Sequence, residues 1–141
     1  MHIVIVGCGR VGATLATMLD HAGHSVAIVD QADTAFQRLP KDFSGQTILG
    51  TGIDEDVLRE AGIEHADAFA AVMTADNRNI MAAQVAKHIF GVKKVVCRIY
   101  DPLREETYRE LGLETICPTT IGARMIAQCF ENSVDRVLKA S

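Results

Sequence analysis

The stretch that decides the fold stands at the start of the chain and reads Val4-Ile5-Val6-Gly7-Cys8-Gly9-Arg10-Val11-Gly12. An apolar run leads into a G-x-G-x-x-G pattern that opens a helix, an order typical of a loop that binds a nucleotide pyrophosphate. In such a loop Gly7 permits the tight turn and Gly9 lets the backbone approach the phosphates. Gly12 lets the helix pack closely on the sheet.

The first amides of the following helix are the expected phosphate ligands. Gly9, Arg10 and Val11 stand where unpaired N–H groups and the helix dipole favour an anion. The alternative is a glycine-rich structural turn that binds no ligand. Because the pattern directly follows an apolar strand and opens a helix, we predict a nucleotide phosphate site here.

Asp30 closes the second apolar run and completes this fingerprint. A carboxylate at that point accepts hydrogen bonds from the ribose hydroxyls of an adenosine. The alternative is an ordinary acidic residue after a strand. The next three residues, Gln31, Ala32 and Asp33, include no arginine for a 2′-phosphate and add a second acid. We therefore expect NADP to bind more weakly than NAD by about tenfold or more.

Short apolar runs alternate with helix-length segments along the chain. The runs are His2–Val6, Ser25–Val29, Thr47–Leu49, Ala68–Met73, Lys94–Ile99 and Glu114–Cys117. The segments predicted as helices are Arg10–Ala22, Thr34–Leu39, Asp54–Ala61, Asn77–Phe90, Leu103–Leu111 and Ile121–Leu138. Near-continuous apolarity suits parallel strands covered on both faces, joined by right-handed crossovers. The predicted fold class is α/β: a Rossmann-type, doubly wound parallel sheet of six strands in the order 3-2-1-4-5-6, in a single domain over residues 1–141.

Further candidates follow the third and fourth strands, at the edge of the sheet where open α/β folds bind ligands. Thr51 and Gly52 come after the third run, and Met73 and Thr74 end the fourth. The two threonines are able to hydrogen-bond a base or a ribose. Helix capping explains Thr74 equally well.

Arg98 ends the fifth apolar run, where a charge is costly unless it is paired. Its candidate partners are Asp76, Asp101 and a ligand phosphate. The planar guanidinium suits phosphate oxygens. We expect Arg98, together with Arg10, to supply the positive charge that the glycine loop lacks.

Composition limits the classes of function. The chain has 141 residues, of which 48% are apolar and 23% charged, as is typical of one soluble domain. Its formal net charge of −4 argues against binding to nucleic acid. No apolar run reaches the roughly 18 residues that cross a bilayer, and a strand-like run follows Met1 at once. We therefore expect a cytosolic protein without a signal peptide.

The residue patterns of catalytic and metal sites are missing from the sequence. The cysteines form no Cys-x-x-Cys pair, so reduced thiols are expected at Cys8, Cys97, Cys117 and Cys129. The histidines lack metal-ligand spacing, and no nucleophile triad or P-loop is present. No second region follows that would hold a substrate against a nicotinamide. We predict no metal, no catalytic residue and no enzymatic activity.

A series of landmarks occurs in one order and spacing over essentially the whole chain. They are Gly7–Gly12, Asp30, Gly50–Gly52, Asp54–Leu58, Ala61–Ile63, Ala66–Ala68, Thr74–Asn79, Arg98–Pro102 and Ile116–Pro118. Together they resemble the N-terminal domain of TrkA-type potassium-uptake regulators, the RCK or KTN domain. Thr51 departs from the resemblance, because that family usually has Asp or Asn there. The second small domain that usually follows is not in this sequence.

The resemblance implies a nucleotide-sensing, cytosolic regulatory subunit that gates a membrane potassium-transport partner at the inner face of the membrane. The implied ligand is NAD(H), with ATP, ADP or AMP as alternatives. It also implies that phosphates are held by Gly7–Val11 and Arg98, the ribose by Asp30, the adenine region by Thr51, and the ribose edge by Met73 and Thr74. Arg10 in such loops can face a neighbouring subunit's nucleotide. The candidate cofactor-binding residues are Gly7, Cys8, Gly9, Arg10, Val11, Gly12, Asp30, Thr51, Gly52, Met73, Thr74 and Arg98.

Two other classes of function stay open at this point. One is a cofactor-binding domain or fragment of an NAD-dependent oxidoreductase. The other is a Rossmann interaction module that has lost its ligand.

The last predicted helix carries a wide apolar stripe. Its members are Ile121, Met125, Ile126, Cys129, Phe130, Val134, Val137 and Leu138. One sheet face does not need a stripe this wide, and a monomer does not expose so much apolar surface. We predict a homodimer or higher homo-oligomer built partly on this helix. The alternative is a helix packed on its own sheet.

Overall fold

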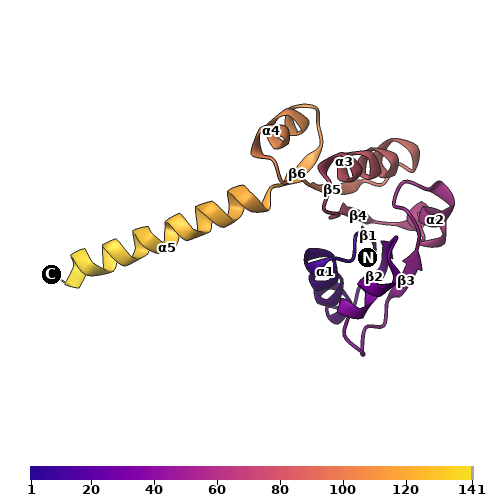
Figure 1. Cartoon of the computed structure of the whole chain (residues 1–141), viewed down its shortest axis with the longest axis horizontal. Coiled ribbons are helices and arrows are strands. Elements are labelled where there is room, and N and C mark those ends of the chain that lie inside the picture. The colour runs from indigo at the N-terminus through magenta and orange to yellow at the C-terminus, as the bar shows by residue number, and fades with distance from the viewer. Residues whose placement is uncertain (141) are drawn as a thin grey trace.

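The glycine-rich turn lies at the carboxyl end of the central strand of a six-stranded parallel sheet (Figure 1). The computed structural model describes residues 1–140, and the side chains of residues 1–132. The sheet order is β3-β2-β1-β4-β5-β6. The strands are β1 (His2–Val6), β2 (Ser25–Asp30), β3 (Gln46–Leu49), β4 (Ala68–Ala71), β5 (Lys94–Arg98) and β6 (Glu114–Ile116). The predicted fold class and strand order are confirmed.

The helices follow the predicted alternation. They are α1 (Arg10–His21), α2 (Glu55–Glu60), α3 (Asp76–Gln84), α4 (Pro102–Glu110) and α5 (Pro118–Ala140), with the short 3₁₀ helices η1 (Asp33–Arg38) and η2 (Ile63–His65) and a π-helical segment η3 (Val85–Ile89). Several details differ from the prediction. The helix expected over Asn77–Phe90 is divided into α3 and the π-helical segment η3, and η2 was not expected. The helix expected over Thr34–Leu39 is the 3₁₀ helix η1, and the last helix begins at Pro118 instead of Ile121. Proline suits the first helical position because its missing N–H would be unpaired there.

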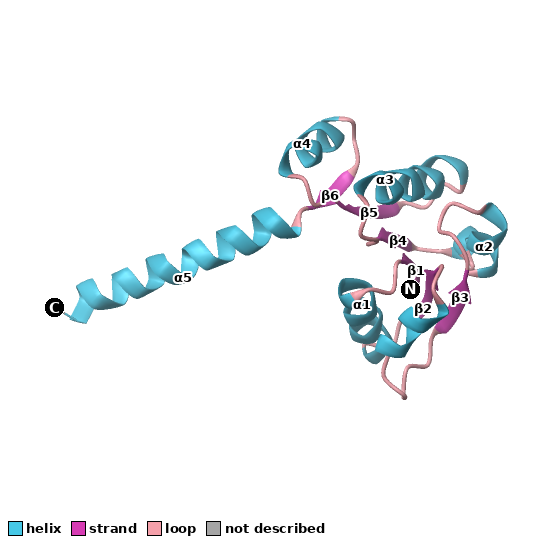
Figure 2. Cartoon of the chain, viewed as in Figure 1, coloured by secondary structure: helices cyan, strands magenta, loops and turns pink. Residues whose placement is uncertain are grey.

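Apolar side chains cover both faces of the sheet. Val4 and Val6 of β1 pack with residues of α2 and α3, whereas Ile3 and Ile5 pack with residues of α1. Figure 2 shows the same division, with α1 on one side of the strands and α2 and α3 on the other. The alternation follows from the two-residue period of a strand, and it explains why the strand sequences are apolar throughout.

The strand order creates a crevice beside β1. The chain runs outward from β1 to β2 and β3, then crosses to the other side of β1 and continues through β4, β5 and β6. The connections after β1 and β4 therefore leave the sheet on opposite sides. At such a switch point the carboxyl ends of the strands are open to a ligand.

Helix α5 extends from the end of β6 away from the sheet (Figure 1). Its described part exposes Met125, Ile126 and Phe130, each by more than half. The alternative that this helix packs on its own sheet does not hold for the described residues. Three members of the predicted stripe, Val134, Val137 and Leu138, lie outside the described side chains. Within residues 1–140, no helix is long and apolar enough to pass through a membrane.

Asn79 of α3 is a buried amide that ties two strand ends together. It is completely buried, and its Oδ1 accepts a hydrogen bond from the Met73 amide at 2.7 Å. Its Nδ2 donates to the carbonyl oxygens of Met73 at 2.8 Å and Arg98 at 2.9 Å. The ends of β4 and β5 are thus held in place beneath the crevice.

Replacing Asn79 with alanine is expected to destabilise the fold. A buried polar group left without a partner costs about 1–3 kcal/mol. The substitution removes the hydrogen-bond partner of the Met73 amide and of the carbonyl oxygens of Met73 and Arg98. We expect the free energy of unfolding, measured with urea, to fall by at least about 2 kcal/mol. Asn77→Ala is the matched control, because Asn77 is exposed and its side chain bonds only Arg104 among the described residues. Equal losses in the two variants would contradict the role of Asn79.

Candidate functional site

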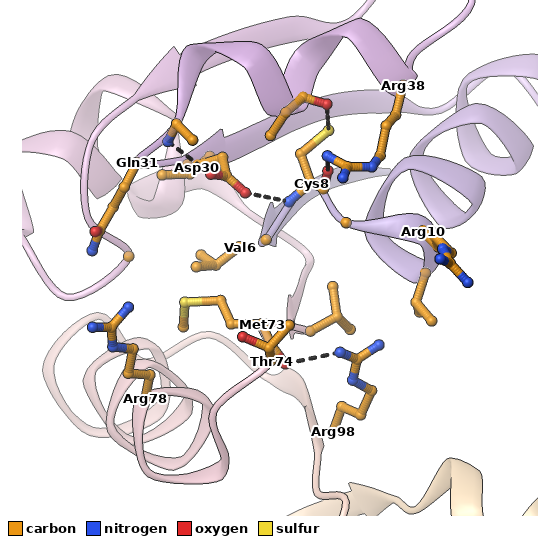
Figure 3. A pocket seen from close by; sticks show the side chains of 18 of the residues that line it. Val6, Cys8, Arg10, Asp30, Gln31, Arg38, Met73, Thr74, Arg78 and Arg98 are labelled. Carbon is orange, nitrogen blue, oxygen red and sulfur yellow. Dashed lines mark hydrogen bonds between the residues drawn. The ribbon is translucent and has the colours of Figure 1, made fainter.

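The crevice holds a pocket of about 850 Å³ at the carboxyl ends of β1, β2, β4 and β5 (Figure 3). This volume lies within the range of small-molecule and cofactor sites. The structure brings ten of the twelve predicted binding residues to its walls: Gly7, Cys8, Gly9, Arg10, Val11, Asp30, Gly52, Met73, Thr74 and Arg98. Gly12 and Thr51 are not among the lining residues.

The three glycines of the loop have different environments. Gly7 has a φ of +108°, which residues with a side chain rarely adopt. A β-carbon on Gly12 would lie 1.7 Å from the carbonyl oxygen of Gly7, so only glycine allows this approach of α1 to the strand end. A β-carbon on Gly9 would meet no protein atom within 4 Å. Gly12 is therefore required by the protein itself, whereas the space beside Gly9 faces the pocket.

Asp30 is half-buried, and the backbone holds its carboxylate in position. One oxygen accepts from the Cys8 amide at 2.8 Å, and the other accepts from the Ala32 amide at 2.9 Å. An ionised carboxylate offers about four acceptor positions. The fold therefore orients Asp30 and leaves acceptor capacity for ribose hydroxyls. Because the Cys8 amide donates to Asp30, it is not available to bond a phosphate.

The side chain of Cys8 serves the structure of the loop. It is completely buried, and its thiol donates to the carbonyl oxygen of Ala35 at 3.4 Å. Burial raises the pKa of Cys8 to about 11, and the nearby Asp30 carboxylate adds to this rise. The thiol is therefore protonated at neutral pH and acts as a donor that fixes η1 against the glycine loop.

Arg98 is a buried cation on the opposite wall of the pocket. It is only 7% exposed, and one guanidinium nitrogen donates to the Met73 carbonyl at 2.9 Å. The same nitrogen contacts the hydroxyl of Tyr100, and the guanidinium carbon lies 4.4 Å from the centre of that ring. The Nε atom is buried and has no hydrogen-bond partner among the described residues.

Neither acid suggested by the sequence pairs with Arg98. Asp76 accepts hydrogen bonds from the amides of Tyr100 and Asp101, and Asp101 caps α4 through the amide of Leu103. No ion pair of Arg98 occurs in the described part of the chain. A buried charge without a counter-charge is costly, so an anion in the pocket would compensate it.

Two arginines of the pocket, Arg38 and Arg78, were not predicted from the sequence. Arg38 ends η1, eight residues after Asp30, and donates to the Cys8 carbonyl at 3.4 Å. No local sequence signal marks it, because its place in the pocket depends on Ala35 packing against Cys8, 27 positions earlier in the chain. Arg78 lies in the first turn of α3, on the opposite wall from Asp30 (Figure 3).

Comparison with known proteins bears on this arrangement of loop, carboxylate and arginines. Residues 3–118 match the model of the TrkA-N domain. The chain belongs to the TrkA-N domain family. This TrkA-N domain is 56% identical over 116 residues to "Trk system potassium uptake protein TrkA" of Streptomyces coelicolor, covering 82% of this chain and 52% of that protein. It is 38% identical over 111 residues to the "Trk system potassium uptake protein TrkA homolog" of Pyrococcus abyssi, covering 79% of this chain and 49% of that one. The chain thus spans about half the length of these relatives.

Solved structures share the fold of this TrkA-N domain. The TrkA-N domain of the inner membrane protein ybaL from Escherichia coli superposes with a TM-score of 0.80 at 18% identity, covering 91% of this chain and 95% of that one. The GsuK structure bound to ADP gives a TM-score of 0.77 at 21% identity, covering 94% and 34% of the two chains. The GsuK channel bound to NAD superposes with a TM-score of 0.70 at 20% identity, covering 85% of this chain and 22% of that one.

A Gly9→Val substitution tests whether the loop of this TrkA-N domain binds phosphates. Gly9 has φ −80° and ψ −160°, at the border of the extended region that residues with a side chain adopt, and a β-carbon there would touch no protein atom. The fold should therefore survive, while valine fills the space that a pyrophosphate needs. We expect the affinity for NAD and ATP in calorimetry to fall by about tenfold or more.

The thermal unfolding midpoint of the valine variant controls for damage to the fold. Gly9→Ala should show an intermediate affinity, because its side chain is smaller. Unchanged nucleotide affinity in a folded Gly9→Val protein would exclude this loop as the phosphate site.

Proposed function

We propose that this TrkA-N domain binds an adenine nucleotide in the pocket beside β1. The observation that carries the proposal is the buried Arg98, which lines the pocket without an acidic partner in the described residues. Facing it are the glycine loop at the start of α1 and the oriented carboxylate of Asp30. In the proposed complex the phosphates lie between Gly9 and Arg98, and the ribose hydroxyls bond Asp30.

Among adenine nucleotides, we propose NAD(H) as the first candidate and ATP, ADP or AMP as the alternatives. Support comes from the similar folds that carry NAD and ADP in their solved structures. Asp30 does not separate these ligands, because all of them keep both ribose hydroxyls. Selectivity between them therefore depends on what lies beyond the phosphates, on the side of Arg98 and Thr74.

We further propose a regulatory role in potassium uptake. The relatives named TrkA support a cytosolic subunit that senses the nucleotide and gates a membrane potassium-transport partner. No catalytic function is proposed, although oxidoreductases share this fold. In this proposal residues 1–141 form one nucleotide-binding domain, and nucleic acid is not a ligand.

The proposed assembly is a homodimer or higher homo-oligomer that uses α5. Ile121, Met125, Ile126 and Phe130 are all exposed on a helix that leaves the body of the domain. Contiguous apolar surface of this kind marks an interaction site. The face of α5 that carries these residues would be covered by the same face of a second copy.

Arg98→Ala tests the phosphate contact in the proposed nucleotide complex. The unmodified chain is expected to bind NAD or ATP in calorimetry, and the variant should bind both about tenfold or more weakly, because hydrogen bonds to charged groups are worth about 1.5–3 kcal/mol. Adenosine has no phosphate, so its affinity should change less. Equal losses for all three ligands would instead assign Arg98 a structural role.

Nucleotide titration and an NADH turnover assay distinguish the proposed function from the two alternatives, a module that has lost its ligand and an oxidoreductase domain. Absence of binding by any adenine nucleotide to the unmodified chain would contradict the proposal and favour a module that has lost its ligand. Steady turnover of NADH with a carbonyl compound would favour the oxidoreductase alternative. Arg59→Ala is the matched control for the loss of an arginine, because Arg59 lies on α2 and pairs with Glu55 and Asp56 outside the pocket.

Self-association is tested by placing a charge on the apolar face of α5. Ile126→Glu should shift the chain toward the monomer in sedimentation velocity at equal concentration, because a buried carboxylate is unfavourable in an apolar interface. Arg124→Gln changes the net charge by the same amount on the side of the helix away from the apolar stripe and should leave association unchanged. A monomer at all concentrations in the unmodified chain would contradict the assembly.

A further inference from the structure

Arg38 places a cation at the end of the pocket where the adenosine ribose is proposed to bind. Cys8 connects the two groups: its amide donates to Asp30 at 2.8 Å, and its carbonyl oxygen accepts from Arg38 at 3.4 Å. The carboxylate and the guanidinium thus lie on either side of one residue of the glycine loop. In Figure 3 both side chains approach Cys8, and Arg78 lies on the opposite wall.

The packing of η1 on the glycine loop brings Arg38 to the pocket without an ion pair. Ala35 is 6% exposed and accepts the hydrogen bond of the Cys8 thiol at 3.4 Å, which holds η1 on the loop. Arg38 follows one turn later on the same face. Its single hydrogen bond is long, and no carboxylate pairs with it in the described part of the chain. Most of the donors of its guanidinium therefore stay available to a ligand.

The pyrophosphate of a bound dinucleotide does not account for this cation. In the proposed complex the pyrophosphate meets the amides at the start of α1 and Arg98. Arg38 instead contacts the carbonyl oxygen of Cys8, the residue whose amide bonds Asp30. The pocket lining contains four arginines but only one carboxylate, that of Asp30. The arginines are Arg10, Arg38, Arg78 and Arg98. A second anionic group on the ribose would match the cation that is left over.

We propose that Arg38 is a specificity-determining residue that receives a 2′-phosphate on the adenosine ribose, so that the pocket accepts NADP(H) as well as NAD(H). The inference rests on the proposed nucleotide function. A phosphate monoester carries a charge of about −1.5 to −2 at neutral pH and three acceptor oxygens. The guanidinium fork of arginine matches that geometry. Arg38 thereby offsets the repulsion from Asp30, and this replaces the expectation that residues 31–33 alone exclude NADP.

The test compares ligands that differ only in the 2′-phosphate. NAD is titrated against NADP, and 5′-AMP against adenosine 2′,5′-bisphosphate, by calorimetry of the full chain at one ionic strength. Adenosine 3′,5′-bisphosphate controls for charge that is present at the wrong ribose position. In the unmodified chain we expect NADP to bind less than about tenfold more weakly than NAD, and the 2′,5′-bisphosphate to bind more tightly than the 3′,5′ isomer.

Three variants assign the effect to Arg38. Arg38→Ala should lower the affinity for NADP relative to NAD by about tenfold or more, and Arg38→Lys should restore part of that ratio. Lys41→Ala removes a cation three residues further along the chain that does not line the pocket, and it should leave the ratio unchanged.

The outcomes separate the inference from the proposed function. If the unmodified chain binds NADP more than about tenfold more weakly than NAD, the inference is overturned while the nucleotide function stands. The same holds if Arg38→Ala changes the ratio of NADP to NAD affinity by less than about tenfold. Equal loss in Lys41→Ala and Arg38→Ala would also overturn it, because general charge would then explain the effect. Binding of no adenine nucleotide at all would overturn both.

Discussion

The approach of Gly12 to the carbonyl oxygen of Gly7 is the constraint on which the rest of the site depends. A single additional carbon at Gly12 would lie 1.7 Å from that oxygen. Because the two residues are in contact, α1 begins directly at the end of β1 and its first amides face the crevice. The turn also sets the direction of the Cys8 peptide, which bonds Asp30 through its amide and Arg38 through its carbonyl. One contact between two glycines thus positions the first amides of the helix, the proposed phosphate ligands, and both charged side chains at the proposed ribose site.

The opposite wall depends on a different kind of contact. Asn79 satisfies three backbone groups at the ends of β4 and β5, and it thereby fixes the carbonyl oxygen of Met73 that also holds Arg98. The aromatic ring of Tyr100 covers the guanidinium and lowers the cost of its burial. Since these partners are neutral, the positive charge of Arg98 is held in position without being neutralised. Most buried charges in proteins are paired, and this departure is what makes the wall suitable for an anion.

Much of this arrangement could be predicted from the sequence because it is local. The loop Gly7–Gly12 and Asp30 follow apolar strands, so the order of elements alone brings them to one edge of the sheet. The predicted strands agree with the observed ones to within a few residues. Side-chain pairing at a distance was harder to predict. The sequence offered Asp76 and Asp101 as partners for Arg98, but backbone amides use both carboxylates. Arg38 was missed because its place in the pocket depends on η1 folding back over Cys8, a contact between residues 27 positions apart.

The burial of Cys8 has a consequence for the chemical durability of the loop. Because burial raises the pKa of Cys8 to about 11, its thiol stays protonated at neutral pH. Peroxides and alkylating agents react with the thiolate form and need access to the sulfur atom. The Cys8 thiol is protonated and completely buried, so it meets neither condition. A domain proposed to bind NAD(H) thus carries, at the centre of the proposed binding loop, a buried and protonated thiol that is protected from oxidants.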